Sequence, residues 1–247
     1  MITGLFKGFS YIFKGFSLIT QKGIRPFVLV PLLINISVFS LAIWISTNQL
    51  DSWIERLLPN WLSWLEWLLW PIFAVIFFFI IFYTFTIVAN LIAAPFNALL
   101  AERVEKKLNG LPLPEFQGYK SVPALIGRTF KSEAQKLLYM AKWFIALLIL
   151  TVIPGLNVLA PFAWLIFGAW MLAVEYIDYP MGNHELFFKD ELITLKKYKS
   201  LALGLGAGLS ILTLIPIFNF LAMPIGVASS TALYVEKLTK DYPEVMT

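Results

Sequence analysis

Residues 150–161 read Leu-Thr-Val-Ile-Pro-Gly-Leu-Asn-Val-Leu-Ala-Pro, and residues 212–224 read Leu-Thr-Leu-Ile-Pro-Ile-Phe-Asn-Phe-Leu-Ala-Met-Pro. At an offset of 62 the two stretches share seven of eleven positions, and their closing prolines match after one insertion. Each stretch interrupts a long run without charged residues. Interrupted apolar helices are how membrane proteins carry polar backbone to the depth of the bilayer. The repeat therefore predicts a protein that handles a solute inside a membrane.

The composition is that of an integral membrane protein. Of the 247 residues, 59% are hydrophobic and 14% are charged, whereas a soluble domain has roughly 45–50% and about 25%. The chain has no cysteine, which excludes a disulfide framework and a thiolate metal site. We therefore expect an all-α protein whose helices cross or enter the lipid bilayer.

Four segments contain no charged residue, namely 26–50, 67–101, 143–174 and 200–235. The hydrocarbon core is about 30 Å thick, and a helix rises about 1.5 Å per residue. The first segment can therefore cross once, from about Pro26 to Thr47. The second is longer than one crossing needs. Tryptophans at its start favour the interface, so we expect its span at about 71–94.

The third segment is divided by Pro154-Gly155 and Pro161, which leave flanks of roughly eleven and thirteen residues. As helices these flanks would be about 17–20 Å long, too short to cross the bilayer. We expect two half-helices that meet at mid-membrane and return to the side they came from. The fourth segment repeats this pattern around Pro216 and Pro224.

The chain is thus expected to form one membrane domain with two long transmembrane helices and two re-entrant helical hairpins. A helix over 4–22 places Leu5, Phe9, Ile12, Phe16 and Ile19 on one face and should lie in the cytoplasmic interface. The consecutive parts of residues 1–247 are an amphipathic N-terminal helix (1–25), two transmembrane helices (26–101), a cytoplasmic helical segment (102–142), the first re-entrant hairpin (143–174), a connecting helix (175–199) and the second re-entrant hairpin (200–235).

Basic residues indicate the topology. Residues 1–25 carry four basic and no acidic groups, and 102–142 carries eight basic against four acidic groups, whereas 48–66 carries one basic and three acidic groups. The first two segments are therefore expected on the cytoplasmic side and the third outside. Four lysines in 175–199 agree with a cytoplasmic location. The alternative is that both hairpins are kinked full spans, which would place 175–199 opposite 102–142.

Enzyme chemistry is not supported by any motif in the chain. There is no hydrolase elbow, paired metal ligands or phosphate-binding loop, and the only histidine, His184, has no partner at ligand spacing. We therefore expect no catalytic residue, no metal site, no cofactor and no nucleic-acid partner. Without a nucleotide-binding motif, the chain is not expected to use ATP itself.

The stretch from Gln21 to Pro26 has the features of an anion site. Pro26 suits the first turn of the following helix, whose free amides carry partial positive charge. Lys22 and Arg25 add two full charges, and Gly23 lets the backbone approach a ligand closely. The alternative is that these residues are ordinary basic flanks of a membrane helix.

A second group of charges follows the second span, where Pro95 is expected to break or kink the helix. Glu102 and Glu105 lie three residues apart and share a face, so they could line an aqueous path together with Arg128. Arg128 and Lys136 could pair with these acids. The alternative is that all of these charges form the solvated end of a long helix.

Small and polar residues in the hairpins suggest how they pack. Asn157 and Asn219 occupy matching places in the repeat, and an asparagine there could cap the returning half-helix. Gly204 and Gly208 lie four residues apart and suit close helix packing within or between subunits.

With these residues assembled, the chain resembles the CysZ family of bacterial sulfate permeases over nearly its whole length. The motifs that carry the resemblance are Phe9-Ser10-Tyr11 with Gly15, Gly23-Ile24-Arg25, Pro31-Leu32-Leu33-Ile34-Asn35, Ala94-Pro95-Phe96-Asn97 followed by Glu102 and Glu105, Ile153-Pro154-Gly155-Leu156-Asn157, and Asp178-Tyr179-Pro180-Met181.

The resemblance implies sulfate uptake across the bacterial inner membrane, which supplies sulfate for assimilation into cysteine. It also implies two long transmembrane helices with two hemi-penetrating hairpins, assembled as a homo-oligomer that members form as a hexamer with protomers in both orientations. The family's Gly-Leu-Arg sulfate motif maps onto Gly23, Ile24 and Arg25, with isoleucine in place of leucine. Some members have a second arginine next, where this chain has Pro26, and Lys22 is the residue that could substitute for it.

Three rivals to sulfate transport follow from the same residues. A permease for a related oxyanion, such as sulfite, thiosulfate or molybdate, would use the same basic site. A membrane scaffold without transport activity would use the amphipathic and re-entrant helices to bind lipid or partner proteins. An intramembrane enzyme is disfavoured because no catalytic set stands at membrane depth.

Overall fold

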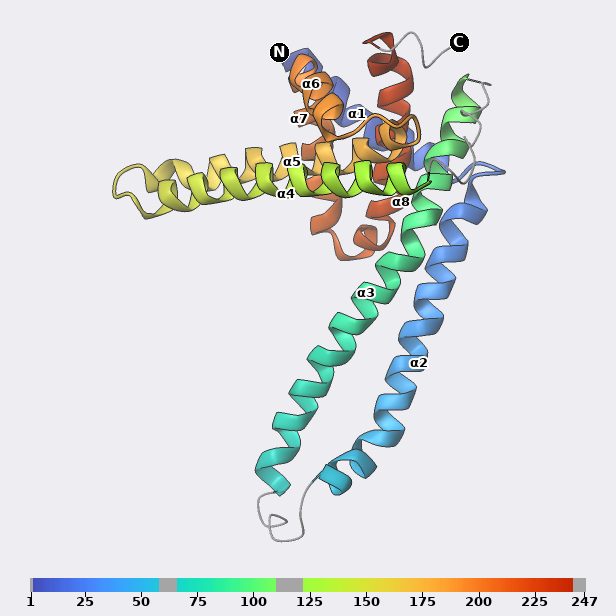
Figure 1. Ribbon diagram of the computed structural model, residues 1–247, viewed down its shortest axis with the longest axis vertical. Coiled ribbons are helices and arrows are strands. Elements are labelled where there is room, and N and C mark those ends of the chain that lie inside the picture. The colour runs from blue at the N-terminus through green and yellow to red at the C-terminus, as the bar shows by residue number, and fades with distance from the viewer. Residues whose placement is uncertain (1, 58–65, 110–121, 242–247) are drawn as a thin grey trace. The chain divides into compact units, whose positions relative to one another are not determined.

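The computed structural model describes residues 2–57, 66–109 and 122–241 (Figure 1). The described residues are almost entirely helical and contain no strand. Contacts between Cα atoms divide the chain into two units. Unit 1 combines Met1–Arg25 with Asn97–Thr247, and unit 2 is Pro26–Phe96. The segment 48–66 entered the topology argument through its charges. Its residues 58–65 lie outside the described residues.

Unit 2 is built from two long helices, α2 (Arg25–Leu57) and α3 (Glu66–Asn109), and α3 continues into unit 1. They contain 33 and 44 residues, so they are about 50 and 66 Å long at the usual rise per residue. Many of their described apolar side chains are exposed, among them Leu33 and Phe78, whereas Val28 of α2 and Leu100 of α3 are buried. The helix does not end at Pro95, so of the expected break or kink at this proline the break is wrong and the kink stays a prediction.

The first interruption predicted from the repeat is present. Helix α4 (Val122–Val152) ends just before Pro154, and α5 (Ala160–Gly182) begins just before Pro161, with a short 3-10 turn at Asn157–Leu159. Gly155 has a φ of +85°, a conformation that glycine adopts without steric cost. The arms are longer than predicted, because α4 and α5 run through the charged segments on either side of the apolar run.

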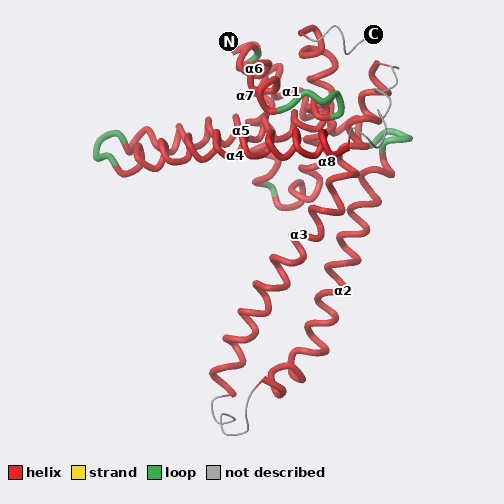
Figure 2. Tube along the Cα trace, in the orientation of Figure 1, coloured by secondary structure: helices red, strands yellow, loops and turns green. Residues whose placement is uncertain are grey.

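The second interruption is also present. Helix α7 (Lys199–Leu214) is followed by Ile215 in extended conformation and then by α8 (Pro216–Leu233). A short helix, α6 (Phe188–Lys197), connects α5 to α7. No side chain caps α5 or α8 at its start, so the proposed asparagine caps are wrong. Figure 2 shows the two turns at different places in unit 1.

Helix α7 lies at the centre of unit 1, where it packs against α1 (Ile2–Ile19), α5 and α8. Glycines make the close approach possible. A Cβ at Gly204 would overlap the backbone carbonyl of Leu5, and a Cβ at Gly208 would press on the side chain of Ile12. On the opposite face of α7, a Cβ at Gly206 would overlap the carbonyl of Ala169 on α5. The predicted packing role of Gly204 and Gly208 is therefore confirmed within the chain.

The N-terminal helix is present at about the predicted residues, and its buried face overlaps the predicted apolar face only in part. Helix α1 buries Gly8, Ile12, Gly15 and Ile19 against α7 and α8. Phe16, which the periodicity placed on the apolar face, is exposed. The reason is that glycine lets two helix backbones approach more closely than phenylalanine does. Glycine rather than the bulk of the side chain decides which face packs.

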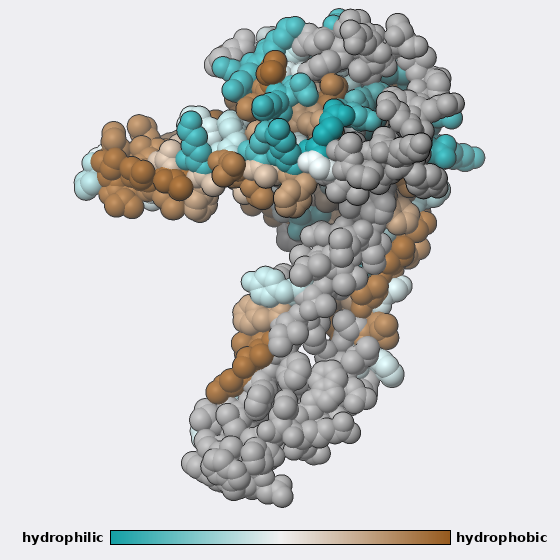
Figure 3. All heavy atoms as spheres, in the orientation of Figure 1, coloured by the Kyte–Doolittle hydropathy of each residue, from teal (hydrophilic) through white to brown (hydrophobic). Residues whose placement is uncertain are grey.

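The exposed surface of unit 1 is apolar at the hairpin tips. Val152, Val158 and Phe162 are 78%, 69% and 64% exposed at the turn between α4 and α5, and Figure 3 shows apolar side chains gathered there. Such patches on a soluble protein would favour aggregation. Three described stretches are long and apolar enough to cross a membrane: Gly127–Val152, Asn157–Gly182 and Phe218–Leu238.

The close approach of α5 and α7 can be tested at Gly206. We expect Gly206→Ala to force the two helices apart, because the new methyl group meets a backbone carbonyl that cannot move alone. Overpacking costs about 1–3 kcal/mol, which lowers the melting temperature of a chain of this size by roughly 2–12 °C. The measurement is thermal unfolding of the purified protein in detergent. Gly168→Ala on α5 is the control, because a Cβ there meets no atom within 4 Å. Equal melting temperatures for the two variants would contradict the packing described.

Candidate functional site

The turn between α1 and α2 holds the Gly23-Ile24-Arg25 motif. Ile24 is 1% exposed and anchors the turn, whereas Lys22, Gly23 and Arg25 face outward. Gly23 has a φ of +88° and no atom within 4 Å of the position of a Cβ. This glycine is needed for its backbone conformation, and the space above it is open to a ligand.

Two backbone donors of this turn are already used. The amides of Ile24 and Arg25 both donate to the carbonyl of Gln21, at 3.2 Å each. The helix-start amides that the sequence offered to an anion are therefore not free at these two positions. The charged donors of the site are its side chains.

A third cation joins the two predicted ones. The ammonium of Lys107, near the end of α3, donates to the carbonyl of Lys22 at 3.4 Å, and Nε of Arg25 donates to the carbonyl of Thr20. Within the described residues, Lys22, Arg25 and Lys107 form no ion pair with a carboxylate. Lys107 is 85 residues away from Lys22 in the sequence, so no local pattern could have found it.

Two of the residues predicted to line a polar path, Glu105 and Arg128, contact the turn that follows α5. A hydrogen bond of 2.7 Å joins Oε1 of Glu105 to Nε2 of His184, and both side chains are buried. Arg128 pairs with Glu185 at 2.7 Å and lies over the ring of Phe187. The consecutive residues at 184 and 185 therefore connect Glu105 to Arg128.

Two pairings expected from the sequence are wrong. Arg128 pairs with Glu185 and not with Glu102 or Glu105. Glu102, although it lies in the same helix as Glu105, is half-exposed and takes no part in the contact with His184. Lys136 also pairs elsewhere, with acids from α4 and α5. Spacing along a helix identified the acids but not the partners that tertiary structure would bring to them.

Lys136 is buried in unit 1 and lies at the centre of three carboxylates that are partly or largely exposed. Its ammonium lies 3.1 Å from Glu133, 3.2 Å from Glu175 and 3.0 Å from Asp178. A buried lysine needs such partners, because its charge is otherwise costly away from water. Asp178 belongs to a motif that the sequence resemblance included, but its pairing with Lys136 was missed.

Glu191 on α6 lies beside this cluster and is fully buried, with neither carboxyl oxygen hydrogen-bonded within the described residues. Burial raises the pKa of the Glu191 carboxyl far above its usual range, and the neighbouring carboxylate of Asp178 raises it further. Glu191 is therefore protonated at neutral pH. Sequence analysis missed this residue because nothing in α6 marks it as buried. No group of three or more His, Asp or Glu in the described ranges is placed to hold a metal ion.

The protonation of Glu191 has a consequence for stability. Between an unfolded pKa of about 4.3 and the raised folded pKa, the folded protein binds a proton that the unfolded chain has released. The free energy of unfolding therefore falls as pH rises through this window. We expect Glu191→Gln, which stays neutral in both states, to reduce the fall in melting temperature between pH 6 and pH 9.

The control for this experiment is Glu102→Gln, which changes the same group at a half-exposed position. Thermal unfolding in detergent across the pH range is the measurement. If Glu191→Gln and the unmodified protein lose stability with the same slope, Glu191 is not protonated in the folded state.

Comparison with known proteins assigns the family. A family model described as Sulfate transporter CysZ/Etoposide-induced protein 2.4 matches residues 11–224. The chain is 42% identical over 234 residues to "Sulfate transporter CysZ" of Pectobacterium atrosepticum, covering 93% of this chain and 85% of that protein. It is 41% identical over 238 residues to the protein of that name in Pseudomonas syringae pv. tomato, covering 95% and 94%. The chain therefore belongs to the family of Sulfate transporter CysZ/Etoposide-induced protein 2.4, a family of transporters and not of enzymes.

Proposed function

We propose that this chain is a sulfate permease of the bacterial inner (cytoplasmic) membrane that supplies sulfate for assimilation into cysteine. The observation that carries the proposal is its similarity, over 93–95% of its length, to proteins named as sulfate transporters. The apolar helices agree with a protein of the membrane. Because the sequence contains no nucleotide-binding motif, we propose channel-like or secondary transport without ATP hydrolysis.

The proposed sulfate site is the basic turn at Lys22, Gly23, Ile24 and Arg25. Sulfate is a strongly hydrated dianion, so a site must replace part of its water shell with fixed donors. Hydrogen bonds from a guanidinium or ammonium to an anion are roughly twice as strong as neutral ones. Arg25 and Lys22, with Lys107 beside them, provide positive charge on an exposed turn that binds weakly enough to release the ion.

We also propose that both hairpins enter the bilayer without crossing it. Residues 143–152 of α4 and 160–174 of α5 carry no charge, and they extend roughly 15 and 22 Å as helices. The hydrocarbon core is about 30 Å thick. The ion pairs of Lys136 with Glu175 and Asp178 lie outside the uncharged residues 143–174 in the sequence. They would therefore stay near the membrane surface. The α7 arm has fifteen uncharged residues, 200–214, and similar reach.

We propose that the path from the basic turn into the protein runs along a group of polar residues near the end of α3. Glu105, His184, Glu185 and Arg128 form two linked pairs, and Glu102 lies one helical turn from Glu105. In this proposal Arg128 supplies the positive charge, and His184 holds Glu105 in place through their hydrogen bond.

The protein is proposed to act as a homo-oligomer, with hexamers of both orientations as the arrangement that the family resemblance implies. The apolar side chains exposed along α2, α3 and the hairpin tips exceed what one chain can bury itself. Lipid and neighbouring copies of the chain would cover them.

Sulfate flux into liposomes that contain only this purified protein tests the function directly. We expect uptake of labelled sulfate well above that of empty liposomes, with and without a proton gradient if the pathway is passive and only with one if it is coupled. Competition by sulfite, thiosulfate and molybdate separates a sulfate permease from a permease for another oxyanion. Absence of flux for all four ions, with the protein inserted and monodisperse, would favour the scaffold alternative.

The sulfate site is tested in the same liposomes by Arg25→Ala. Removing a charged hydrogen-bond donor costs about 1.5–3 kcal/mol, so we expect sulfate affinity to fall roughly 10–100-fold. Lys131→Ala, which removes an exposed cation of α4, should leave affinity unchanged. Equal affinity for the unmodified protein and Arg25→Ala would remove this turn from the site.

A further inference from the structure

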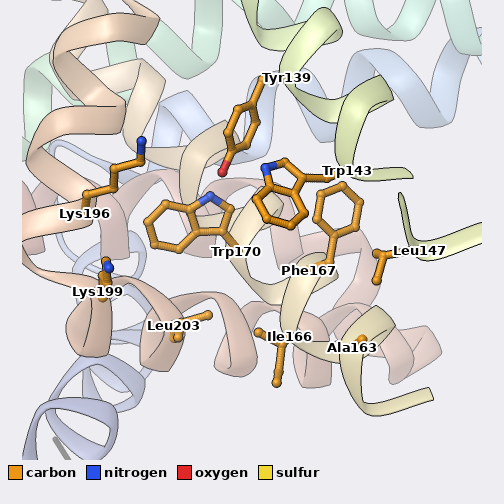
Figure 4. A pocket seen from close by; sticks show the side chains of 10 residues that line it. All are labelled: Tyr139, Trp143, Leu147, Ala163, Ile166, Phe167, Trp170, Lys196, Lys199 and Leu203. Atoms are coloured by element: carbon orange, nitrogen blue, oxygen red, sulfur yellow. The ribbon is translucent and has the colours of Figure 1, made fainter. Parts of the chain in front are cut away.

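Unit 1 contains a cavity whose lining residues are far in sequence from the basic turn. It has a volume of about 440 Å³ and is formed where α4 and α5 meet α6 and α7 (Figure 4). Except for two lysines, every residue that lines it is aromatic or aliphatic. The lining residues are Tyr139, Trp143, Leu147, Ala163, Ile166, Phe167, Trp170, Lys196, Lys199 and Leu203.

The two lysines give the cavity a charged end. Figure 4 shows Lys196 and Lys199 together on one side of the cavity, next to Trp170. Lys196 is at the end of α6 and Lys199 at the start of α7. Within the described residues, neither lysine forms an ion pair. Their charges are therefore available to an anion that enters from the apolar side.

Hydroxyl and indole groups also line the cavity. The hydroxyl of Tyr139 points toward the two indoles (Figure 4). The indole nitrogen of Trp170 is buried without accessible surface and donates no hydrogen bond within the described residues. The lysines and the Tyr139 hydroxyl can therefore donate to an anion in the cavity, whereas the Trp170 nitrogen cannot.

We propose that this cavity binds one anionic phospholipid. The phosphate would lie between Lys196 and Lys199, with a glycerol or ester oxygen near the hydroxyl of Tyr139, and an acyl chain would follow the apolar wall formed by Phe167 and Leu203. Basic pockets between membrane helices bind anionic headgroups in this way, and tryptophan and tyrosine favour the same depth of the bilayer.

A free inorganic anion fits this cavity poorly. Sulfate or phosphate would have to lose water against the aromatic and aliphatic wall, which offers few hydrogen bonds in return. A phospholipid has both parts that the cavity matches, a charged headgroup and an apolar chain. Such a lipid would contact α4, α5, α6 and α7 together. It would hold α4 and α5 against the connection between α6 and α7.

Native mass spectrometry of the full-length, delipidated protein in detergent tests the proposal. Phosphatidylglycerol and phosphatidylcholine with the same acyl chains are titrated separately, in the absence of sulfate. We expect one tightly bound phosphatidylglycerol and no comparable binding of phosphatidylcholine. The double variant Lys196→Gln/Lys199→Gln should weaken phosphatidylglycerol binding about thirtyfold, since each basic residue near an anionic lipid contributes a few-fold factor.

The control is Lys131→Gln/Lys189→Gln, which removes the same net charge from exposed positions outside the cavity. Trp143→Ala, which opens the apolar wall, should also weaken lipid binding but would not affect a site for a bare ion. Unchanged affinity in the Lys196/Lys199 variant, equal binding of phosphatidylcholine, or full displacement of the lipid by inorganic phosphate would each overturn the proposal. None of these outcomes depends on whether the protein transports sulfate.

Discussion

A helix that enters hydrocarbon must satisfy its own backbone, because no water is there to do so. This constraint governs the two places where the apolar runs are interrupted. At the first turn the amide of Asn157 donates to Ile153 and that of Leu159 donates to Leu156, at 3.1 and 2.9 Å. At the second turn the amide of Asn219 donates to Ile215 at 2.8 Å. The prolines remove a donor where the chain reverses. The amides of Asn157, Leu159 and Asn219 find carbonyls within the same turn.

The rest of unit 1 follows from how these apolar helices can be held together. Glycines bring α1 and α5 against α7 at backbone distance, and this packing does not need large side chains. Within the first hairpin, residues 143–174 carry no charge, and the charged residues lie in the parts of α4 and α5 outside this range, where Lys136 is neutralised by three carboxylates. The result is a compact base with polar contacts and two tips whose side chains are apolar and exposed.

The positions of the interruptions could be predicted from the sequence, because a proline has a local and unconditional effect on backbone hydrogen bonding. The bounds of α4 could not, because Lys136 and its acids read as a solvated segment until their pairing is seen. The sequence predicted a break or a kink at Pro95, and the helix continues through this position. A proline therefore predicts a lost backbone hydrogen bond but not by itself the end of a helix.

The candidate site shows the same division between local and long-range information. Gly23 and Arg25 were found because a glycine, a cation and a helix start are neighbours in the chain. Lys107, His184 and Glu191 were missed because each acquires its role from a residue far away in sequence. His184 was assigned no partner, and the structure gives it Glu105, 79 residues earlier.

The depth of the hairpin tips is the measurement that tests the account most directly. Since the chain has no cysteine, single cysteines can be placed at Leu156, at Phe220 and at Lys189 in the protein reconstituted in liposomes. Spin labels at Leu156 and Phe220 should be accessible to oxygen but not to a water-soluble relaxation agent on either side, and the label at Lys189 should be accessible to that agent. If the Leu156 label is exposed to water on the side opposite to Lys189, the first hairpin crosses the membrane and the account is contradicted.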